Sequence, residues 1–484
     1  MARDQHGRVL TWLPVAVVLL ILAGAAGLYF DAWDRFQDWR RPDPQTEPAA
    51  VPPPAGLELP EHAVPGPVVA TVPAARSGDV APHKVGRALA AGLRDRDLGR
   101  HVVARVGDLS GTGPDWSNGE QVFTPASTTK LLTAAAALEA LGPDHRFTTR
   151  VVAGGKARRI VLVGGGDPYL ASKPLTPEEA RTTYPERADV VTLARRTARE
   201  LVEQQGRRPT VRLSYDDSLF SGPVDNPAWR RDYVPDDIVS PITALWVDSG
   251  NDPSGFGNAD DPSRVAAETF ARALARQGVT VVGAPRPGTA APDASEIASV
   301  EGAPLADVVE HLLDVSDNEA AEVVAHHVGV AVDGDGSFAG GARAVLATLD
   351  ELGVPTRGAV LRDGSGLSRH NRLSAETMLA TLRLAALPGQ PDLRAVISGL
   401  PVAGFTGSLT YRFADGEPAG RGAVRAKTGT LTGVHGLAGL VTDRQGNTMV
   451  FVLAADRVKV PDTLDARQTL DQLAAELAAC RCGA

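Results

Sequence analysis

Residues 125–142 read PASTTKLLTAAAALEALG, a run in which a serine and a lysine stand three positions apart before an alanine- and leucine-rich segment. The residues after Lys130 are apolar on nearly every side of a helix. The segment from Ser127 to Leu141 is therefore predicted to be a helix buried in a core and ended by Gly142. Residues three apart share a helix face, so the Ser127 hydroxyl and the Lys130 amine can meet.

A serine hydroxyl becomes a good nucleophile only beside a base, and Lys130 can be that base only when it is neutral. Burial and a second nearby cation both lower the pKa of a lysine, and we expect Lys427 to supply the cation. By itself the pair is weak evidence, because serine and lysine separated by two residues occur by chance in many proteins. The interpretation therefore depends on two later motifs.

The first of these motifs is Ser316-Asp317-Asn318, which separates two segments predicted to be helices, 305–313 and 319–328. In a loop at that place, Ser316 could relay a proton to a leaving group and Asn318 could hold a substrate amide. Taken alone, the same residues are more typical of a helix cap.

The second motif is Lys427-Thr428-Gly429-Thr430, which follows a predicted strand at 423–426. An edge strand can bind an extended peptide through its backbone. Lys427, Thr428 and Thr430 would attract a substrate carboxylate, and Gly429 would let the substrate backbone approach. Lys-Thr-Gly in isolation is a common turn, but the three motifs in this order are what a Ser-Lys acyl-transfer site requires.

Composition limits the other classes of function. The chain has 484 residues and a formal net charge of −9, with no basic stripe of the kind that nucleic acid requires, so nucleic-acid binding is excluded. Its two cysteines, Cys480 and Cys482, stand at the extreme C-terminus. A bond between cysteines so close together is strained and two ligands make a poor metal site, so an exposed tail is expected there.

The N-terminal part predicts export. Residues 9–30 contain no charged side chain, while Arg3 and Arg8 precede them. This stretch can span a bilayer, with residues 1–8 in the cytoplasm and the remainder outside. We expect an uncleaved anchor, with cleavage near residues 23–25 as the alternative. Residues 31–83, rich in proline, are predicted to be an extended linker.

The globular part divides into two regions. Residues 149–297 contain short strands, glycine turns and two amphipathic helices, near 190–205 and 263–277, and are predicted to form an inserted α/β unit. Residues 84–148 and 298–484 are expected to form the catalytic domain. Its last third should hold antiparallel strands at 436–442 and 448–455, joined by a turn at 443–447, and a terminal helix at 464–479.

From about residue 84 to 484 the chain resembles the class C low-molecular-mass penicillin-binding proteins, the D-alanyl-D-alanine carboxypeptidase/endopeptidase family. Besides the three motifs, similar segments are Gly165-Gly166-Asp167-Pro168, Asp216-Asp217-Ser218-Leu219-Phe220, Asp363-Gly364-Ser365-Gly366-Leu367-Ser368, and Thr406-Gly407-Ser408-Leu409 followed by Arg412-Phe413. The resemblance implies an α/β (α+β) fold of the penicillin-binding-protein and serine β-lactamase type. It would have an antiparallel sheet with helices on both sides, an all-helical subregion and one inserted accessory α/β domain.

The resemblance also implies roles for individual residues. Ser127 would be the acylated nucleophile, Lys130 the base, and Ser316 with Asn318 the proton relay and substrate clamp. Carboxylate binding would fall to the later motif: Lys427, Thr428, Gly429 and Thr430. The backbone N–H groups of Ser127 and Thr430 would form the oxyanion hole.

The implied reaction is serine-type hydrolysis of peptidoglycan stem peptides ending in D-Ala-D-Ala, by carboxypeptidase or endopeptidase action, without metal or organic cofactor. β-Lactams would acylate the same serine, and the enzyme would work outside the membrane to which its N-terminal segment attaches it. Two alternatives remain at this point. One is a β-lactamase or esterase on the same scaffold, and the other is a catalytically idle wall-binding module.

Overall fold

The computed structural model describes residues 79–119, 122–156 and 158–484. The predicted cytoplasmic N-terminus (1–8), the anchor (9–30) and the linker up to residue 78 lie outside the described residues. Within the described part, no helix is both long enough and apolar enough to cross a membrane. The expected end of the linker at residue 83 was two residues late, because helix α2 (Pro82–Leu89) begins at Pro82, where proline is favoured in the first helical turn.

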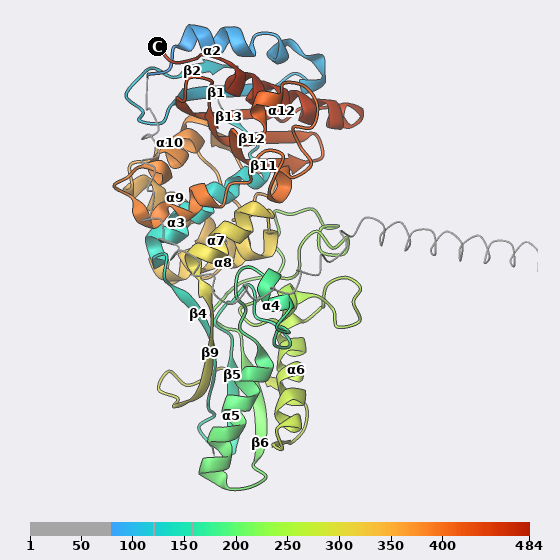
Figure 1. The fold of residues 1–484 in the computed structure, drawn as a ribbon. Coiled ribbons are helices and arrows are strands. Elements are labelled where there is room, and N and C mark those ends of the chain that lie inside the picture. The colour runs from blue at the N-terminus through green and yellow to red at the C-terminus, as the bar shows by residue number, and fades with distance from the viewer. Residues whose placement is uncertain (1–78, 120–121, 157) are drawn as a thin grey trace, which may run out of the picture. The chain divides into compact units, whose positions relative to one another are not determined.

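The first sheet is antiparallel and five-stranded, in the order β11-β12-β13-β1-β2. Its strands are β1 (Val102–Asp108), β2 (Trp116–Asn118), β11 (Val424–Leu431), β12 (Val434–Thr442) and β13 (Thr448–Ala455). Helices α2 and α12 (Thr463–Ala479) pack on one face, and α10 (Ala375–Ala386) packs on the other (Figure 1). An antiparallel sheet with helices on both sides is what the sequence predicted.

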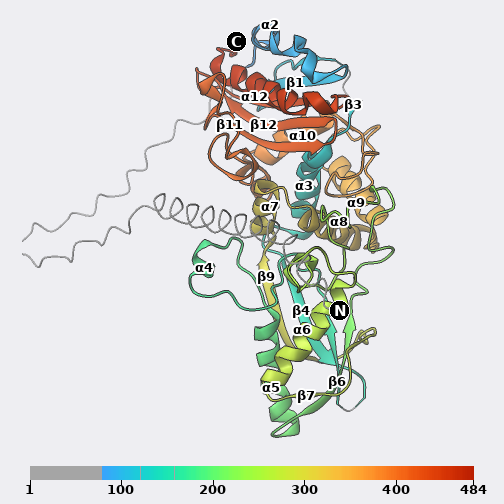
Figure 2. The same cartoon turned by 90° about the vertical axis from the view of Figure 1, so that its right-hand side faces the viewer.

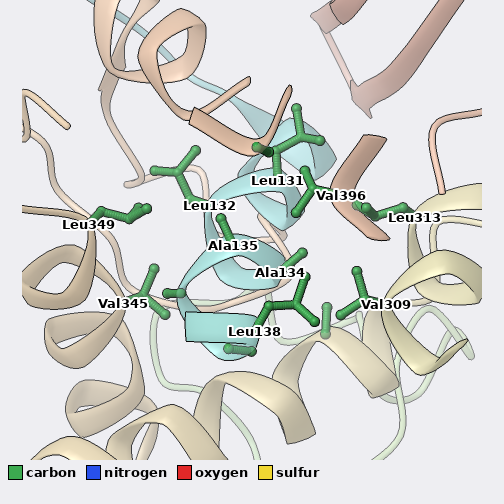
Figure 3. Close-up of a cluster of buried hydrophobic side chains, with 14 of the residues drawn as sticks. Leu131, Leu132, Ala134, Ala135, Leu138, Val309, Leu313, Val345, Leu349 and Val396 are labelled. Carbon is green, nitrogen blue, oxygen red and sulfur yellow. The ribbon is translucent and has the colours of Figure 1, made fainter. Parts of the chain in front are cut away.

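A group of helices surrounds α3 (Lys130–Leu141), which is buried on nearly every side. The group includes α7 (Leu305–Asp314), α8 (Asn318–Asp333), α9 (Phe338–Glu351) and α11 (Ala395–Ser398). Alanine and leucine are strong helix formers, and the small alanines let neighbouring helices approach α3 closely. Figure 3 shows the resulting core, in which α3 side chains lie among those of three neighbouring helices: Val309, Leu313, Val345, Leu349 and Val396.

The predicted helix start at Ser127 was wrong by one turn. Residues Ala126–Thr129 form the 3-10 helix η3, and the α-helix begins at Lys130. Ala126 has a φ of 48°, and the Thr128 hydroxyl donates a hydrogen bond to the Pro125 carbonyl at 2.7 Å. A side chain that bonds to nearby backbone competes with regular α-helix, so the tighter turn is favoured here.

The second sheet is mixed and six-stranded, with the path β7-β6-β5-β4-β9 and β8 paired to β6. Its strands are β4 (Arg146–Ala153), β5 (Arg159–Val163), β6 (Thr210–Asp216), β7 (Thr280–Val281), β8 (Arg286–Pro287) and β9 (Glu296–Pro304). The antiparallel neighbours β4 and β9 lie side by side in both views (Figures 1 and 2). Helices α5 (Val190–Gln205) and α6 (Pro262–Arg276) confirm the two predicted amphipathic helices and cover this sheet.

Shorter elements complete the described part of the chain. They are α4 (Glu179–Thr182), the strand pair β3 (Val122–Phe123) and β10 (Leu373–Ser374), and the 3-10 helices η1 (Gly92–Arg94), η2 (Arg96–Leu98), η4 (Asp248–Gly250), η5 (Pro391–Leu393), η6 (Gly407–Leu409), η7 (Pro418–Gly420) and η8 (Val460–Asp462).

The expectation of an exposed C-terminal tail was wrong. Cys480 and Cys482 form a disulfide, and Cys482 is buried. The backbone N–H groups of Cys482 and Gly483 donate to Asp443 Oδ2 at 3.0 and 3.3 Å, and Cys482 O accepts from the Ala81 N–H. The tail is therefore held against the sheet by a distant turn, through Asp443, and by the start of the described chain, through Ala81. The spacing between the cysteines does not reveal these contacts.

Candidate active site

The predicted nucleophile and base meet in the structure. Lys130 Nζ lies 3.1 Å from Ser127 Oγ, to which it donates a hydrogen bond. Ser127 is partly exposed on η3, while Lys130 is completely buried at the first position of α3. The hydroxyl therefore faces the surface and the amine approaches it from inside the protein.

Two further acceptors fix the Lys130 amine. Its Nζ donates to Asn318 Oδ1 and to the Ser365 carbonyl, both at 2.8 Å. The pKa of Lys130 is lowered to about 8, because burial penalises the ammonium form more than nearby carboxylates, chiefly Glu322, favour it. Burial, rather than the expected cation Lys427, is the cause that lowers this pKa.

Ser316 and Asp317 lie in the turn between α7 and α8, as predicted, while Asn318 is the first residue of α8. Asp317 caps α8, because its side chain accepts from the Ala320 N–H at 2.9 Å, so the capping interpretation applies to this residue. Asn318 Nδ2 donates to the Ile238 carbonyl at 3.0 Å, and this bond orients Asn318 Oδ1 toward Lys130. The motif thus contributes both a helix cap and a direct contact to Lys130.

Ser316 borders the cleft beside Ser127 and has a left-handed φ of 65°. No hydrogen bond joins its hydroxyl to Ser127 or Lys130 in the described part of the chain. Its backbone conformation is one that non-glycine residues seldom adopt, and such conformations concentrate at functional sites.

The Lys427-Thr428-Gly429-Thr430 motif lies within β11, on the edge of the five-stranded sheet. Lys427 is buried and its amine donates to the Thr428 carbonyl at 3.1 Å, while the Thr428 hydroxyl donates to Ser408 Oγ at 3.2 Å. Burial, and then the charge of Lys130, hold the pKa of Lys427 well below its usual range. Two buried amines therefore share one region, and a bound anion would favour the charged form of either.

These segments enclose a cleft of about 320 Å³. It is lined by Ser127, Tyr233, Ile238, Ser316, Asn318, Leu367, Thr428, Thr430, Leu431 and Thr432. Lys130 and Lys427 lie behind this lining, and the backbone of Gly429 packs against the Pro125 carbonyl. All three predicted motifs therefore meet at one cleft, although they are far apart in the sequence.

Several residues at the site were not predicted. Tyr233 and Ile238 reach the cleft from the segment between the first two motifs, and no motif marked them. Glu322 and Ser365 lie behind Lys130; the Asp363–Ser368 run was noted only for its similarity to a family. Glu322 could have been predicted from its spacing, because it follows Asn318 by four residues and so shares a helix face with it.

A second hollow, of about 1180 Å³, is larger than the cleft. It lies among α9 and residues 222–228 and 359–372 and contains none of the predicted catalytic residues. Size alone does not identify an active site, and convergent polar groups with perturbed pKa values favour the smaller cleft. Among the described residues, no cluster of three His, Cys, Asp or Glu side chains is placed to hold a metal ion.

The chain is similar in sequence to known carboxypeptidases. The model of the D-Ala-D-Ala carboxypeptidase 3 (S13) family matches residues 85–254 and 255–477. A carboxypeptidase of Mycobacterium tuberculosis is 36% identical over 445 aligned residues, and the match covers 90% of each chain. The carboxypeptidase DacB of Mycolicibacterium smegmatis is 37% identical over 408 residues, covering 82% of this chain and 84% of that protein.

Among solved structures, penicillin binding protein 4 of Haemophilus influenzae has a similar fold. The TM-score is 0.66 at 22% identity, and the match covers 82% of this chain and 98% of that one. A second structure of the same protein, complexed with a β-lactam, gives a TM-score of 0.59. The fold is thus that of a penicillin-binding protein.

Proposed function

Because the chain belongs to the D-Ala-D-Ala carboxypeptidase 3 (S13) family, we propose that its reaction proceeds through an acyl-enzyme on Ser127. The observation that carries this proposal is the 3.1 Å contact between Ser127 Oγ and the buried Lys130 amine at the cleft. A lysine that burial has made easier to deprotonate is the base that a serine nucleophile needs.

The acylation step follows from this arrangement. Neutral Lys130 takes the Ser127 proton, and Oγ attacks the carbonyl of the penultimate D-Ala of a peptidoglycan stem peptide. The carbonyl oxygen becomes an oxyanion, which the backbone N–H groups of Ser127 and Thr430 would stabilise. When the C–N bond breaks, the proton that Lys130 took from Ser127 passes through Ser316 to the leaving amine, and water later hydrolyses the ester to release the shortened peptide and free Ser127.

The edge strand β11 and the start of α8 would bind the substrate. An extended peptide alongside β11 would place its terminal carboxylate near Lys427, Thr428 and Thr430, while the missing side chain of Gly429 lets β11 lie close to the turn that carries Ser127. Asn318 would donate to or accept from the substrate amide. A bound carboxylate would also restore the charge of Lys427, because an opposite charge nearby favours the ammonium form.

β-Lactams should acylate the same serine, because they present a carbonyl and a carboxylate in a similar arrangement. The related penicillin binding protein 4 of Haemophilus influenzae was solved with a β-lactam bound, which supports this expectation. A stable label from fluorescent penicillin is expected, while rapid turnover of penicillin would support a β-lactamase instead.

The test uses the purified chain with a peptide ending in D-Ala-D-Ala. Ser127→Ala should lose both D-Ala release and labelling by fluorescent penicillin. Ser110→Ala, which removes a loop hydroxyl that does not line the cleft, should retain both. Unchanged D-Ala release in Ser127→Ala would refute the assignment of the nucleophile.

We further propose that residues 9–30 anchor the enzyme to the membrane and that the proline-rich residues after them, up to residue 78, separate it from the bilayer. The uncharged stretch and the preceding arginines support this, as does a family substrate that lies outside the cell membrane. After fractionation of cells, the full chain should be found in the membrane and should be accessible to external protease. A chain lacking residues 1–30 should not be retained there.

The division into a catalytic unit (84–148 with 298–484) and an accessory unit (149–297) is also a proposal. The antiparallel pairing of β4 with β9 supports it, because these strands carry the chain out to the second sheet and back. Limited proteolysis should cut first in exposed loops within 149–297 and leave the penicillin-labelled part intact.

A further inference from the structure

Glu322 is a completely buried carboxylate that the proposed reaction does not use. It stands on α8, one turn after Asn318. Its Oε1 accepts from the Ser365 N–H at 2.7 Å and its Oε2 accepts from the Gly364 N–H at 3.0 Å. The two backbone donors hold this carboxylate in one orientation and favour its ionised form, while burial and then the charge of Asp363 raise its pKa to about 8.

The backbone that Glu322 holds is the same backbone that holds the base. The Ser365 carbonyl accepts a hydrogen bond from Lys130 Nζ at 2.8 Å. The neighbouring Gly364 carbonyl accepts from the Thr133 hydroxyl at 2.7 Å. One short segment is therefore fixed by α8 through Glu322, fixed by α3 through Thr133, and in contact with Lys130.

The charges around this segment come from several elements. The carboxylates that favour the ammonium form of Lys130 are, in decreasing order, Glu322, Asp317, Asp363 and Glu319. Asp363 receives hydrogen bonds from Trp229 Nε1, Asn371 Nδ2 and the N–H groups of Gly366 and Ser368. Asp317 caps α8, and Glu319 accepts from the Ser240 N–H. Among these four carboxylates, Glu322 is the one that accepts a hydrogen bond from Ser365, the residue whose carbonyl accepts from Lys130.

We propose that Glu322 is a positioning residue for the acylation step: it holds the Ser365 carbonyl against Lys130 and supplies the countercharge that sets the pH at which Lys130 becomes a base. The inference rests on the proposed role of Lys130. As Glu322 ionises near a pH of about 8, its charge favours the ammonium form of Lys130, so it raises the pH at which the amine is free to accept the Ser127 proton. Its hydrogen bonds keep that amine directed at the hydroxyl.

The test measures the second-order rate constant for acylation by fluorescent penicillin from pH 5.5 to 10. Glu322→Gln keeps the shape of the side chain and removes its charge. The acid limb of the pH–rate profile, where the rate rises with pH, should therefore move to lower pH by about one unit. The maximum rate should fall about tenfold, since only one of the two backbone donors keeps an acceptor and a slightly misplaced base is costly. A limb at the wild-type pH would overturn the proposal.

Two matched variants separate charge from packing. Thr133→Val removes the other hydrogen bond to the same segment without changing any charge, so the maximum rate should fall while the limb stays in place. Glu322→Asp keeps the charge and should leave the limb near the wild-type pH. If Glu322→Gln behaves like Thr133→Val, or if Glu322→Asp moves the limb as far as Glu322→Gln does, the electrostatic role is refuted.

If Glu322→Gln fails to fold, Glu322→Met is a second variant of similar length without charge. The same shift of its pH–rate profile to lower pH is expected. A profile at the wild-type pH would again contradict the proposal. Failure of the proposed function is distinguishable, because it would show as residual acylation in Ser127→Ala, whatever the Glu322 variants do.

Discussion

At the scale of single residues, the site depends on a lysine that the protein has made easy to deprotonate. Lys130 is fully buried with a pKa lowered to about 8, and its amine is held by Ser127, Asn318 and Ser365. Lysine accepts a proton only in its neutral form. Lys130, the proposed base, is therefore largely protonated near pH 6 and increasingly available as the pH rises.

The acylation rate of the wild-type chain should consequently rise with pH, with half of the increase reached at a pH of about 8. The sign follows from the neutral fraction of Lys130, which grows as pH passes through its pKa. Stopped-flow measurements with fluorescent penicillin would check this. A rate that is constant from pH 6 to 9 would contradict the assignment of Lys130 as the base.

Spacing in the sequence predicts some contacts between single residues of the site but not others. Ser127 and Lys130 are three residues apart, and local helix geometry was enough to place them in contact. Glu322 and Ser365 are 43 residues apart, and Ser365 is 235 residues from Lys130. Their contacts arise from tertiary packing, which no local pattern encodes.

At the scale of elements, β11 must pass very close to the turn that carries Ser127. A Cβ placed on Gly429 would lie 2.6 Å from the Pro125 carbonyl oxygen, a backbone atom that cannot move aside cheaply. Gly429→Ala should therefore displace the strand or the turn and reduce acylation by about tenfold or more, because small misplacements are costly in catalysis.

The measurement for Gly429→Ala is again labelling by fluorescent penicillin, with a thermal melt to follow stability. Gly389→Ala is the matched control, because a Cβ at Gly389 would meet no atom within 4 Å. The control should label and melt like the wild type. Wild-type labelling of Gly429→Ala would show that the close approach is not needed.

Helix α8 gives a second prediction at this scale. Asp317→Ala removes the cap of α8 and an acceptor of the Tyr169 hydroxyl, so it should lower the free energy of unfolding by about 1 kcal/mol. Acylation should fall as well, because the same turn places Ser316 and Asn318. Ser374→Ala removes the cap of α10, away from the cleft, and should cost similar stability without loss of acylation. Equal activity in both variants would contradict the prediction.

The elements themselves were largely predictable. Hydrophobic periodicity located α5, α6, α7, α8 and α12, and turn residues located the hairpin between β12 and β13. The start of α3 was missed because the Thr128 hydroxyl bonds to the Pro125 carbonyl, an interaction that the apolar pattern of the following turns does not reveal.

At the scale of the whole described chain, distant segments complete both the site and the fold. Tyr233 and Ile238, from the segment carrying the second sheet, line the cleft beside Ser127. The carbonyl of Ile238 accepts from Asn318, so this segment also orients a residue that contacts Lys130. A motif search identifies catalytic chemistry but does not locate such contributors, because their identity depends on how the segments pack.

The two ends of the described chain meet in a similar way, at a buried carboxylate. Asp443 accepts from the N–H groups of Gln445, Asn447, Cys482 and Gly483 and from the Asn447 side chain. Beside it, Val80 pairs with Gly483, and Lys84 Nζ donates to the Gly483 carbonyl at 2.5 Å. One side chain thus joins a hairpin turn to the C-terminus, which in turn contacts the first described residues.

Asp443→Ala should therefore destabilise the fold without disabling the cleft. Several buried backbone N–H groups would lose their acceptor, and the free energy of unfolding should fall by about 2–4 kcal/mol. Removal of residues 480–484 should lower the melting temperature in the same direction, because it exposes the surface that Cys482 covers. Chemical denaturation and thermal melts measure both effects. Labelling by fluorescent penicillin well below the melting temperature should stay near the wild-type rate, since Asp443 does not line the cleft. If labelling fell while stability was unchanged, the contact would instead belong to catalysis.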